Sequence, residues 1–259
     1  MITALILIDG LRPDGIIQSE AVYLKKLLTD FSYTFTARTI LPSITLPCIT
    51  TLFLGVPPEE HGTWDNLFSS NGWKTPGLID LLHENGFKTA SFYNWEQLRD
   101  VSKPGSTDIS FCLNNSESKN LPLGKSDWDL TCQALSILKN EQIDFVFLYL
   151  GCVDSAGHTF GWMSREYIET INNADKCVKY FLENIGDDAI FYITADHGGI
   201  DFGHGSDSDE EMLIPVISNN EIIEKGEIRS PVSILDIAPS ISALYQVDIP
   251  AEWQGKIIR

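Results

Sequence analysis

Apolar runs rich in Ile, Val, Leu, Phe and Tyr alternate along this chain of 259 residues with stretches whose apolar residues recur at helical spacing. Short, continuous apolar runs are typical of strands that are buried on both faces. Their alternation with amphipathic stretches predicts an α/β fold, with a mostly parallel central sheet and helices on both faces. The expected strands are Thr3–Ile8, Lys88–Tyr93, Asp144–Leu150, Ala189–Thr194 and Leu213–Ile217.

The helical stretches lie between these runs. Gly55 stands where a helix would end, in agreement with the left-handed conformation that follows many helices. The segment Val101–Ser126 is dense in Ser, Asn, Pro and Gly, which predicts a long surface loop in place of a larger insertion. We expect a single domain over residues 1–259. The predicted helices are Ala21–Leu28, Leu78–Glu84, Asp127–Leu138, Tyr167–Glu183 and Val232–Tyr245.

Acidic residues closely follow three of the predicted strands. Asp9 comes directly after the first strand, and Asp154 and Asp196 come shortly after two later ones. Ligands of an open α/β sheet bind outside the carboxyl ends of its strands, so these carboxylates are expected to converge there. A single Asp at a strand end is more often a helix cap or a turn residue, and the prediction therefore rests on all three together.

Three of the five histidines lie near these acids. His158 stands four residues after Asp154, His197 directly follows Asp196, and His204 lies in a Gly-His-Gly sequence. Imidazole and carboxylate are ligands that a zinc-like ion accepts, and a catalytic ion needs about three protein ligands and one open position. The set is large enough to bind two ions.

A nucleophile is available in the segment Leu41–Gly55, where Thr45 precedes an apolar run of helical length. The N-terminus of a helix presents unpaired N–H groups and a positive dipole end, which suits a hydroxyl that becomes a phosphoryl ester. The alternative is that Thr45 is only a helix N-cap, with Pro47 in the first turn.

Charge and cysteine content narrow the classes of substrate and environment. The formal charge of −18 disfavours nucleic-acid polymers, whereas bound cations would still permit a small phosphate ester. No apolar segment approaches the roughly 20 residues of a membrane span, and the first residues resemble a core strand more than a signal peptide. Five scattered cysteines without a C-x-x-C pair predict no disulfide framework, so we expect a cytoplasmic location.

Several motifs together resemble the alkaline phosphatase superfamily, and within it the branch of type I phosphodiesterases and nucleotide pyrophosphatases. The resemblance runs nearly from end to end and is specific as a set. The motifs that carry it are Ile6-Leu-Ile-Asp-Gly-Leu-Arg-Pro-Asp14, Leu41-Pro-Ser-Ile-Thr-Leu-Pro47, Leu54-Gly-Val-Pro-Pro-Glu-Glu-His-Gly62 with Trp64-Asp-Asn66, Asp154-Ser-Ala-Gly-His158, Asp196-His-Gly-Gly199, His204-Gly205 and Asp236-Ile-Ala-Pro-Ser240.

The resemblance implies a site with two divalent ions, zinc by preference and manganese or iron as alternatives. One ion would bind Asp154, His158 and His204, and the other would bind Asp9, Asp196, His197 and the hydroxyl of Thr45. It also implies a small phosphorylated substrate, hydrolysed through a phospho-threonine intermediate on Thr45, and an alkaline phosphatase-like core whose cap insertion is short or absent.

Two features depart from that branch. Cys48 stands three positions after Thr45, where we expect the family to carry an Asn that holds a phosphoryl oxygen, and a thiol is a weaker donor. We therefore consider Cys48 as a substrate contact. The chain is also short for the branch, so elements that contact a leaving group are expected to be missing. A sulfatase is disfavoured because the C-x-P-x-R pattern is absent.

Other readings stay open at this point. A phosphomonoesterase or a phosphonate hydrolase would use the same chemistry, and a non-catalytic protein that binds a phosphorylated ligand would keep the same pocket. His61 and His83 are interpreted as structural, and Trp64 and Trp162 as core residues, with the wall of a substrate pocket as the alternative. Arg12 either reaches a phosphate or pairs with Asp14.

Overall fold

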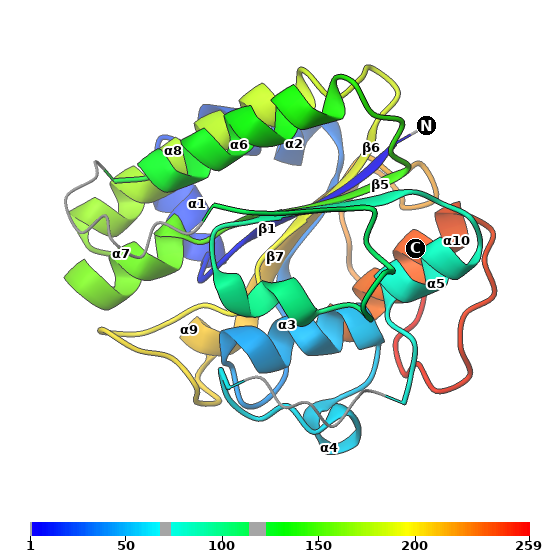
Figure 1. The fold of residues 1–259 in the computed structure, drawn as a ribbon. Helices are drawn as coiled ribbons and strands as arrows, with labels where there is room; N and C mark the ends of the chain where they lie inside the picture. Colours follow the sequence, from blue (N-terminus) through cyan, green and yellow to red (C-terminus); the bar gives the residue numbers. More distant parts are fainter. Residues whose placement is uncertain (1, 68–73, 114–122) are drawn as a thin grey trace.

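The computed structural model describes residues 2–67, 74–113 and 123–259. In these ranges eight strands form one sheet, in the order β4-β3-β5-β1-β6-β7-β2-β8. Helices cover both faces of the sheet, and no large cap lies over the described part of the chain (Figure 1). The predicted α/β class with a mostly parallel sheet is confirmed.

The centre of the sheet is parallel and fully buried. In β1 (Thr3–Ile8) and β5 (Phe145–Leu150) every residue is buried, as expected for apolar runs that are covered on both faces. β1 pairs in parallel with β5 on one side and with β6 (Ile190–Thr194) on the other. The carboxyl ends of these three neighbouring strands therefore lie at the same edge of the sheet.

One flank of the sheet is parallel and the other is mixed. β3 (Thr89–Tyr93) pairs in parallel with β5 and with the edge strand β4 (Ile109–Cys112). On the other side β7 (Leu213–Ser218) runs antiparallel to both β6 and β2 (Ser32–Arg38). The last strand, β8 (Gly226–Glu227), pairs in parallel with β2.

Two groups of helices enclose the sheet (Figure 1). α8 (Arg165–Leu182) packs against its neighbours α1 (Pro13–Gln18), α2 (Val22–Asp30) and α6 (Lys125–Leu138) on one face. On the other face α3 (Thr45–Leu54) packs against α5 (Leu78–Glu84) and α10 (Ile237–Leu244). Gly55 ends α3 with a φ of 62°, as its position predicts.

The short elements are α4 (Pro58–His61), α7 (Cys152–Phe160), α9 (Asp209–Met212) and the 3₁₀ turns at Glu96–Asp100 and Ile234–Asp236. α7 and α9 lie at the end of the sheet where β1, β5 and β6 finish (Figure 1). In the described part of the chain, no helix combines the length and the apolar character that a bilayer crossing requires.

Three expectations about elements need correction. β2 was not predicted, because its residues alternate between buried and partly exposed positions instead of forming one apolar run. The expected loop Val101–Ser126 contains the edge strand β4, and its residues 114–122 lie outside the described ranges. The expected helix Val232–Tyr245 begins later, because Ser233 and Asp236 form a capping box around a 3₁₀ turn.

Candidate metal and nucleophile site

Thr45 is the first residue of α3, and the N-cap position belongs to Ile44, whose backbone is extended. The hydroxyl of Thr45 is therefore not a capping group. Its Oγ1 lies 3.1 Å from Nε2 of His197, which comes shortly after β6. The interpretation of Thr45 as an N-cap alone is wrong, and the side chain faces the acidic edge of the sheet.

The three predicted acids converge at this edge. Asp9 follows β1 and Asp196 follows β6, and the backbone N–H of Gly10 donates to Asp196 Oδ1 at 3.2 Å. Asp154 comes shortly after β5, as expected, and lies in the first turn of α7, which begins two residues after the strand ends. His158 stands one turn later on the same helix, so both side chains point in the same direction.

One group of ligand atoms consists of Asp154, His158 and His204. Asp154 Oδ1 lies 3.5 Å from His158 Nε2 and 3.7 Å from His204 Nε2, and the two Nε2 atoms are 3.1 Å apart. This is the first predicted ligand set.

A second group surrounds His197. Its Nε2 lies 3.4 Å from Asp9 Oδ1 and 3.4 Å from Asp196 Oδ2, in addition to the hydroxyl of Thr45. The structure thus brings together all members of the second predicted set. Asp154 is also within reach of Asp9 and His197, so its carboxylate lies between the two groups.

The proton positions of the three histidines are fixed by backbone carbonyls. The Nδ1 atoms of His158, His197 and His204 lie 2.9, 2.8 and 2.7 Å from the carbonyl oxygens of Phe202, Gly198 and Ser43. A carbonyl only accepts, so each neutral ring carries its proton on Nδ1 and a lone pair on Nε2. The Nε2 atoms of His158 and His204, which are 3.1 Å apart, then face each other with their lone pairs. A cation bound by both nitrogens would accept these lone pairs and remove the repulsion between them.

The three carboxylates also lack hydrogen-bond partners. One oxygen of each acid is buried without a hydrogen-bond partner, namely Asp9 Oδ1, Asp154 Oδ1 and Asp196 Oδ2. Burial raises the pKa of all three acids, and the neighbouring Asp196 and Asp154 raise that of Asp9 further. Burial likewise lowers the pKa of His204 to about 3, which keeps the ring neutral. Unpartnered oxygens and neutral imidazoles are the donor set that divalent ions such as zinc require, so these residues fit two ions.

Residues that were not predicted hold this set in place. The hydroxyl of Tyr149 donates to Asp9 Oδ2. Gly10 adopts a φ of 68°, and a Cβ there would meet the Cα of Asp154 at 3.0 Å, so this turn requires glycine. The Gly10 carbonyl accepts from Trp162 Nε1 at 3.0 Å and from the Tyr167 hydroxyl at 2.8 Å. Tyr149 lies in the apolar run of β5 and Tyr167 on the amphipathic helix α8, where nothing in the sequence distinguishes them from core residues.

The structure does not support Cys48 as a substrate contact. Its side chain is fully buried, and its Sγ lies 3.6 and 3.9 Å from the carbonyl oxygens of Pro42 and Ile40. The thiol therefore faces the loop that precedes α3. Asn66 instead reaches the start of the helix, where its Oδ1 accepts from the backbone N–H of Leu46 at 2.9 Å. The sequence offered a signal for Asn66, since the residue ends the Trp64-Asp-Asn66 motif.

The remaining interpretations are settled by contacts. Arg12 donates to both carboxylate oxygens of Asp14, at 2.9 and 2.6 Å, and so takes the second of its two predicted roles. His61 lies 2.9 Å from Thr51 Oγ1 and accepts from the backbone N–H of Thr63, which is a structural role. Trp162 is buried beside His158, whereas Trp64 is 49% exposed, so the interpretation as a core residue is wrong for Trp64.

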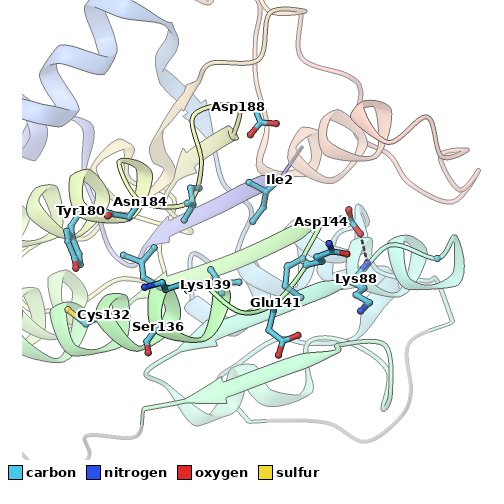
Figure 2. Close-up of a pocket in the computed structure, with 16 residues that line it drawn as sticks. Ile2, Lys88, Cys132, Ser136, Lys139, Glu141, Asp144, Tyr180, Asn184 and Asp188 are labelled. Atoms are coloured by element: carbon cyan, nitrogen blue, oxygen red, sulfur yellow. Dashed lines mark hydrogen bonds between the residues drawn. The ribbon is translucent and has the colours of Figure 1, made fainter.

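A pocket of about 1000 Å³ lies at the opposite end of the sheet (Figure 2). Ile2, Lys88 and Asp144, which line it, precede β1, β3 and β5. None of the predicted site residues lines this pocket. The cluster of Asp and His side chains around Thr45 is therefore the better candidate for the catalytic site.

Solved structures share this fold. The murine ectonucleotide pyrophosphatase / phosphodiesterase 5 superposes with a TM-score of 0.81 at 12% identity, over 96% of each chain. A 2-O GAG sulfatase superposes with a TM-score of 0.76 at 16% identity, over 99% of this chain and 73% of the other. At these identities the likeness concerns the fold alone.

Curated relatives match at the sequence level. A 2,3-bisphosphoglycerate-independent phosphoglycerate mutase from Antithamnion sp. is 30% identical over 54% of this chain and 28% of its own length. A GPI ethanolamine phosphate transferase 1 from Gibberella zeae is 23% identical over 96% of this chain and 31% of its own length. The chain thus spans about a third of the length of these relatives. The model of type I phosphodiesterases / nucleotide pyrophosphatases matches residues 3–240, and the chain therefore belongs to this family.

Proposed function

We propose that this protein cleaves small phosphate esters, with a preference for diesters, through a phosphoryl intermediate on Thr45 and with two divalent ions. The observation that carries the proposal is the hydroxyl of Thr45 beside His197, within a set of three imidazoles and three carboxylates that each bury one unpartnered oxygen. A set that served only to hold the fold would leave no carboxylate oxygens unpartnered at the same place.

The residues divide into two groups, one for each ion. Asp154, His158 and His204 would hold one ion, and Asp9, Asp196 and His197 would hold the other together with Thr45. When bound, the ions would favour the deprotonated nucleophile and stabilise the negative charge that develops on the phosphoryl group. We assign zinc as the first choice, with manganese or iron as alternatives.

The reaction begins when Thr45 Oγ1 gives its proton to solvent water and attacks phosphorus. A bond forms between this oxygen and phosphorus, the bond to the leaving alcohol breaks, and the leaving alkoxide takes up a proton from solvent. Water then attacks the same phosphorus and the bond to Thr45 Oγ1 breaks, so that one proton of the water returns to Thr45 and the product leaves as a phosphate monoester. We assign the amide of Asn66 a supporting role, because its Oδ1 accepts from the N–H of Leu46 and its NH₂ group would donate to a phosphoryl oxygen.

The relatives support this choice of chemistry. A threonine-to-alanine variant of the murine phosphodiesterase, described as inactive, forms a complex with AMP. Several curated relatives are GPI ethanolamine phosphate transferases, whose name likewise indicates the transfer of a phosphate ester. A phosphomonoesterase or phosphonate hydrolase would use the same residues, and a cytoplasmic location stays a prediction.

The test compares an aryl phosphodiester with its monoester on metal-stripped protein refilled with zinc or manganese. We expect faster metal-dependent release from the diester, and a loss of at least about 10³-fold in turnover for Thr45→Ala with both ions retained. Preference for the monoester would move the assignment to a phosphatase. Equal behaviour of the wild type and Thr45→Ala would indicate a non-catalytic binder.

A further inference from the structure

Glu211 is a buried acid outside the predicted ligand set, with 3% of its surface exposed. It lies in the single turn of α9, directly before β7. Its carboxylate accepts hydrogen bonds from two separate segments of the chain, at Ser43 and at residues 205–208. They are the backbone N–H groups of Gly205 and of Ser206 (2.5 Å) and the hydroxyls of Ser43 (3.1 Å), Ser206 (2.5 Å) and Ser208 (3.3 Å).

Hydrogen bonds alone hold this charge. Within residues 2–67, 74–113 and 123–259, no Lys, Arg or His side chain forms an ion pair with Glu211. Burial by itself would raise the pKa of Glu211, but the hydrogen bonds from Ser206, Gly205 and Ser43 outweigh it and lower the pKa. The carboxylate is therefore ionised. The Ser43 hydroxyl also lies 2.8 Å from the carbonyl oxygen of Ser206, so its single proton is shared between that carbonyl and Glu211.

The two segments that meet at Glu211 carry the chemistry of the site. Ser43 lies two residues before Thr45, and its carbonyl accepts the Nδ1 proton of His204 at 2.7 Å. Gly205 directly follows His204, and its N–H also lies 3.0 Å from Ser43 Oγ. The carboxylate thus fixes both the carbonyl that orients the His204 ring and the backbone that carries it.

We propose that Glu211 is the positioning residue of the ion bound by Asp154, His158 and His204, and that it sets this ion's affinity through Ser43 and Gly205. The inference rests on the proposed function, because it concerns one of the two ions assigned there. Groups that orient a ligand's ring nitrogen raise metal affinity without touching the metal, since they fix the tautomer and the direction of the lone pair.

Glu211→Gln tests this inference. The amide replaces one acceptor oxygen with an NH₂ group that would face N–H and O–H donors, so at least one of them loses its acceptor. Stripped protein is titrated with Zn²⁺ against a chromophoric chelator, and folding is followed by circular dichroism. We expect one ion to bind about 10-fold or more weakly and the other to bind as in the wild type.

Two further variants complete the design. Asp175→Asn is the matched control, because Asp175 is a buried acid that accepts backbone N–H groups of Tyr23 and Leu24 far from the site. It is expected to lower the unfolding temperature and leave both affinities unchanged. Ser43→Ala removes the hydroxyl that faces Glu211 but keeps the carbonyl that accepts from His204, and it should weaken the same ion several-fold even where Glu211→Gln does not fold.

The outcomes separate the two proposals. Two ions in the wild type, with one weakened in Glu211→Gln or Ser43→Ala, would support the role of Glu211. Two ions bound with unchanged affinity in both variants would overturn this role and leave the proposed function intact. A wild-type protein that binds no Zn²⁺ would overturn both.

Discussion

At the scale of single residues, the direction of hydrogen bonds decides what the site can bind. Three ring protons point outward to backbone carbonyls, and three carboxylate oxygens point inward without a partner. The Nε2 lone pairs of the histidines therefore face the unpartnered carboxylate oxygens, and both are hydrogen-bond acceptors. Buried acceptors without donors are rare in proteins, and a bound cation would stabilise them. By the same reasoning we propose Asn66 as a substrate contact, because its oxygen accepts from the N–H of Leu46 and its NH₂ group is the donor end of the amide.

Asn66→Asp isolates that donor. The carboxylate keeps the hydrogen bond to Leu46, but it removes the N–H groups and adds a negative charge beside the phosphoryl group. We expect kcat to fall by about 10²-fold, the usual cost of losing one donor to a developing oxyanion. Steady-state kinetics on the aryl diester measures this, with zinc content as the control. Unchanged kcat would remove Asn66 from the mechanism.

At the scale of elements, α7 must be held firmly because it carries both Asp154 and His158. Its first N–H groups are satisfied by residues from elsewhere in the chain. Asp127 on α6 accepts from the N–H of Cys152 at 3.3 Å, and Asn94 joins it by donating to Asp127 at 2.7 Å and accepting from Gly151 at 3.2 Å. These bonds fix the start of the helix and therefore the height of its two ligands above the sheet.

Because Asp127 is a buried acid, its contribution to the free energy of unfolding depends on pH. Burial raises its pKa to about 6, above the value of about 3.9 in an unfolded chain. Its contribution to stability is thus complete below about pH 3.9 and is lost as the pH rises through about 6. The stability of the wild type relative to Asp127→Asn should fall by roughly 2 kcal/mol between pH 4 and pH 7.

Urea unfolding of metal-free protein at several pH values measures this difference. The site carboxylates titrate in both proteins, so their contributions cancel in the comparison. A difference that stays constant or grows with pH would show that Asp127 is ionised throughout the range.

At the scale of the whole molecule, the net charge of −18 acts on every substrate that approaches. An anionic diester is repelled over distances comparable to the screening length, which shrinks from about 30 Å at 0.01 M salt to about 10 Å at 0.1 M. We expect kcat/KM for the diester to rise a few-fold with added salt over this range while kcat stays constant. A decrease with salt would instead indicate local cationic groups that guide the substrate.

The sequence predicted the fold class and the convergence of the site, because both follow from the order of apolar runs and the position of Asp9, Asp154 and Asp196 after strands. It did not predict the half-buried strand β2 or the short edge strand β4. The residues of these strands form no continuous apolar run, and neighbouring strands in the sheet decide which of them are buried. It also missed Glu211, Asp127 and Tyr149. Their roles depend on partners far away in the sequence, which no local pattern reveals.

The most direct test of the account is a search for the covalent intermediate. The metal-loaded protein is mixed with the aryl diester and quenched in acid during turnover, and the peptides are analysed by mass spectrometry. The account predicts a phosphoryl adduct on the peptide that contains Thr45, absent from Thr45→Ala and from stripped protein. Metal-dependent turnover that leaves no adduct, together with an active Thr45→Ala, would contradict it.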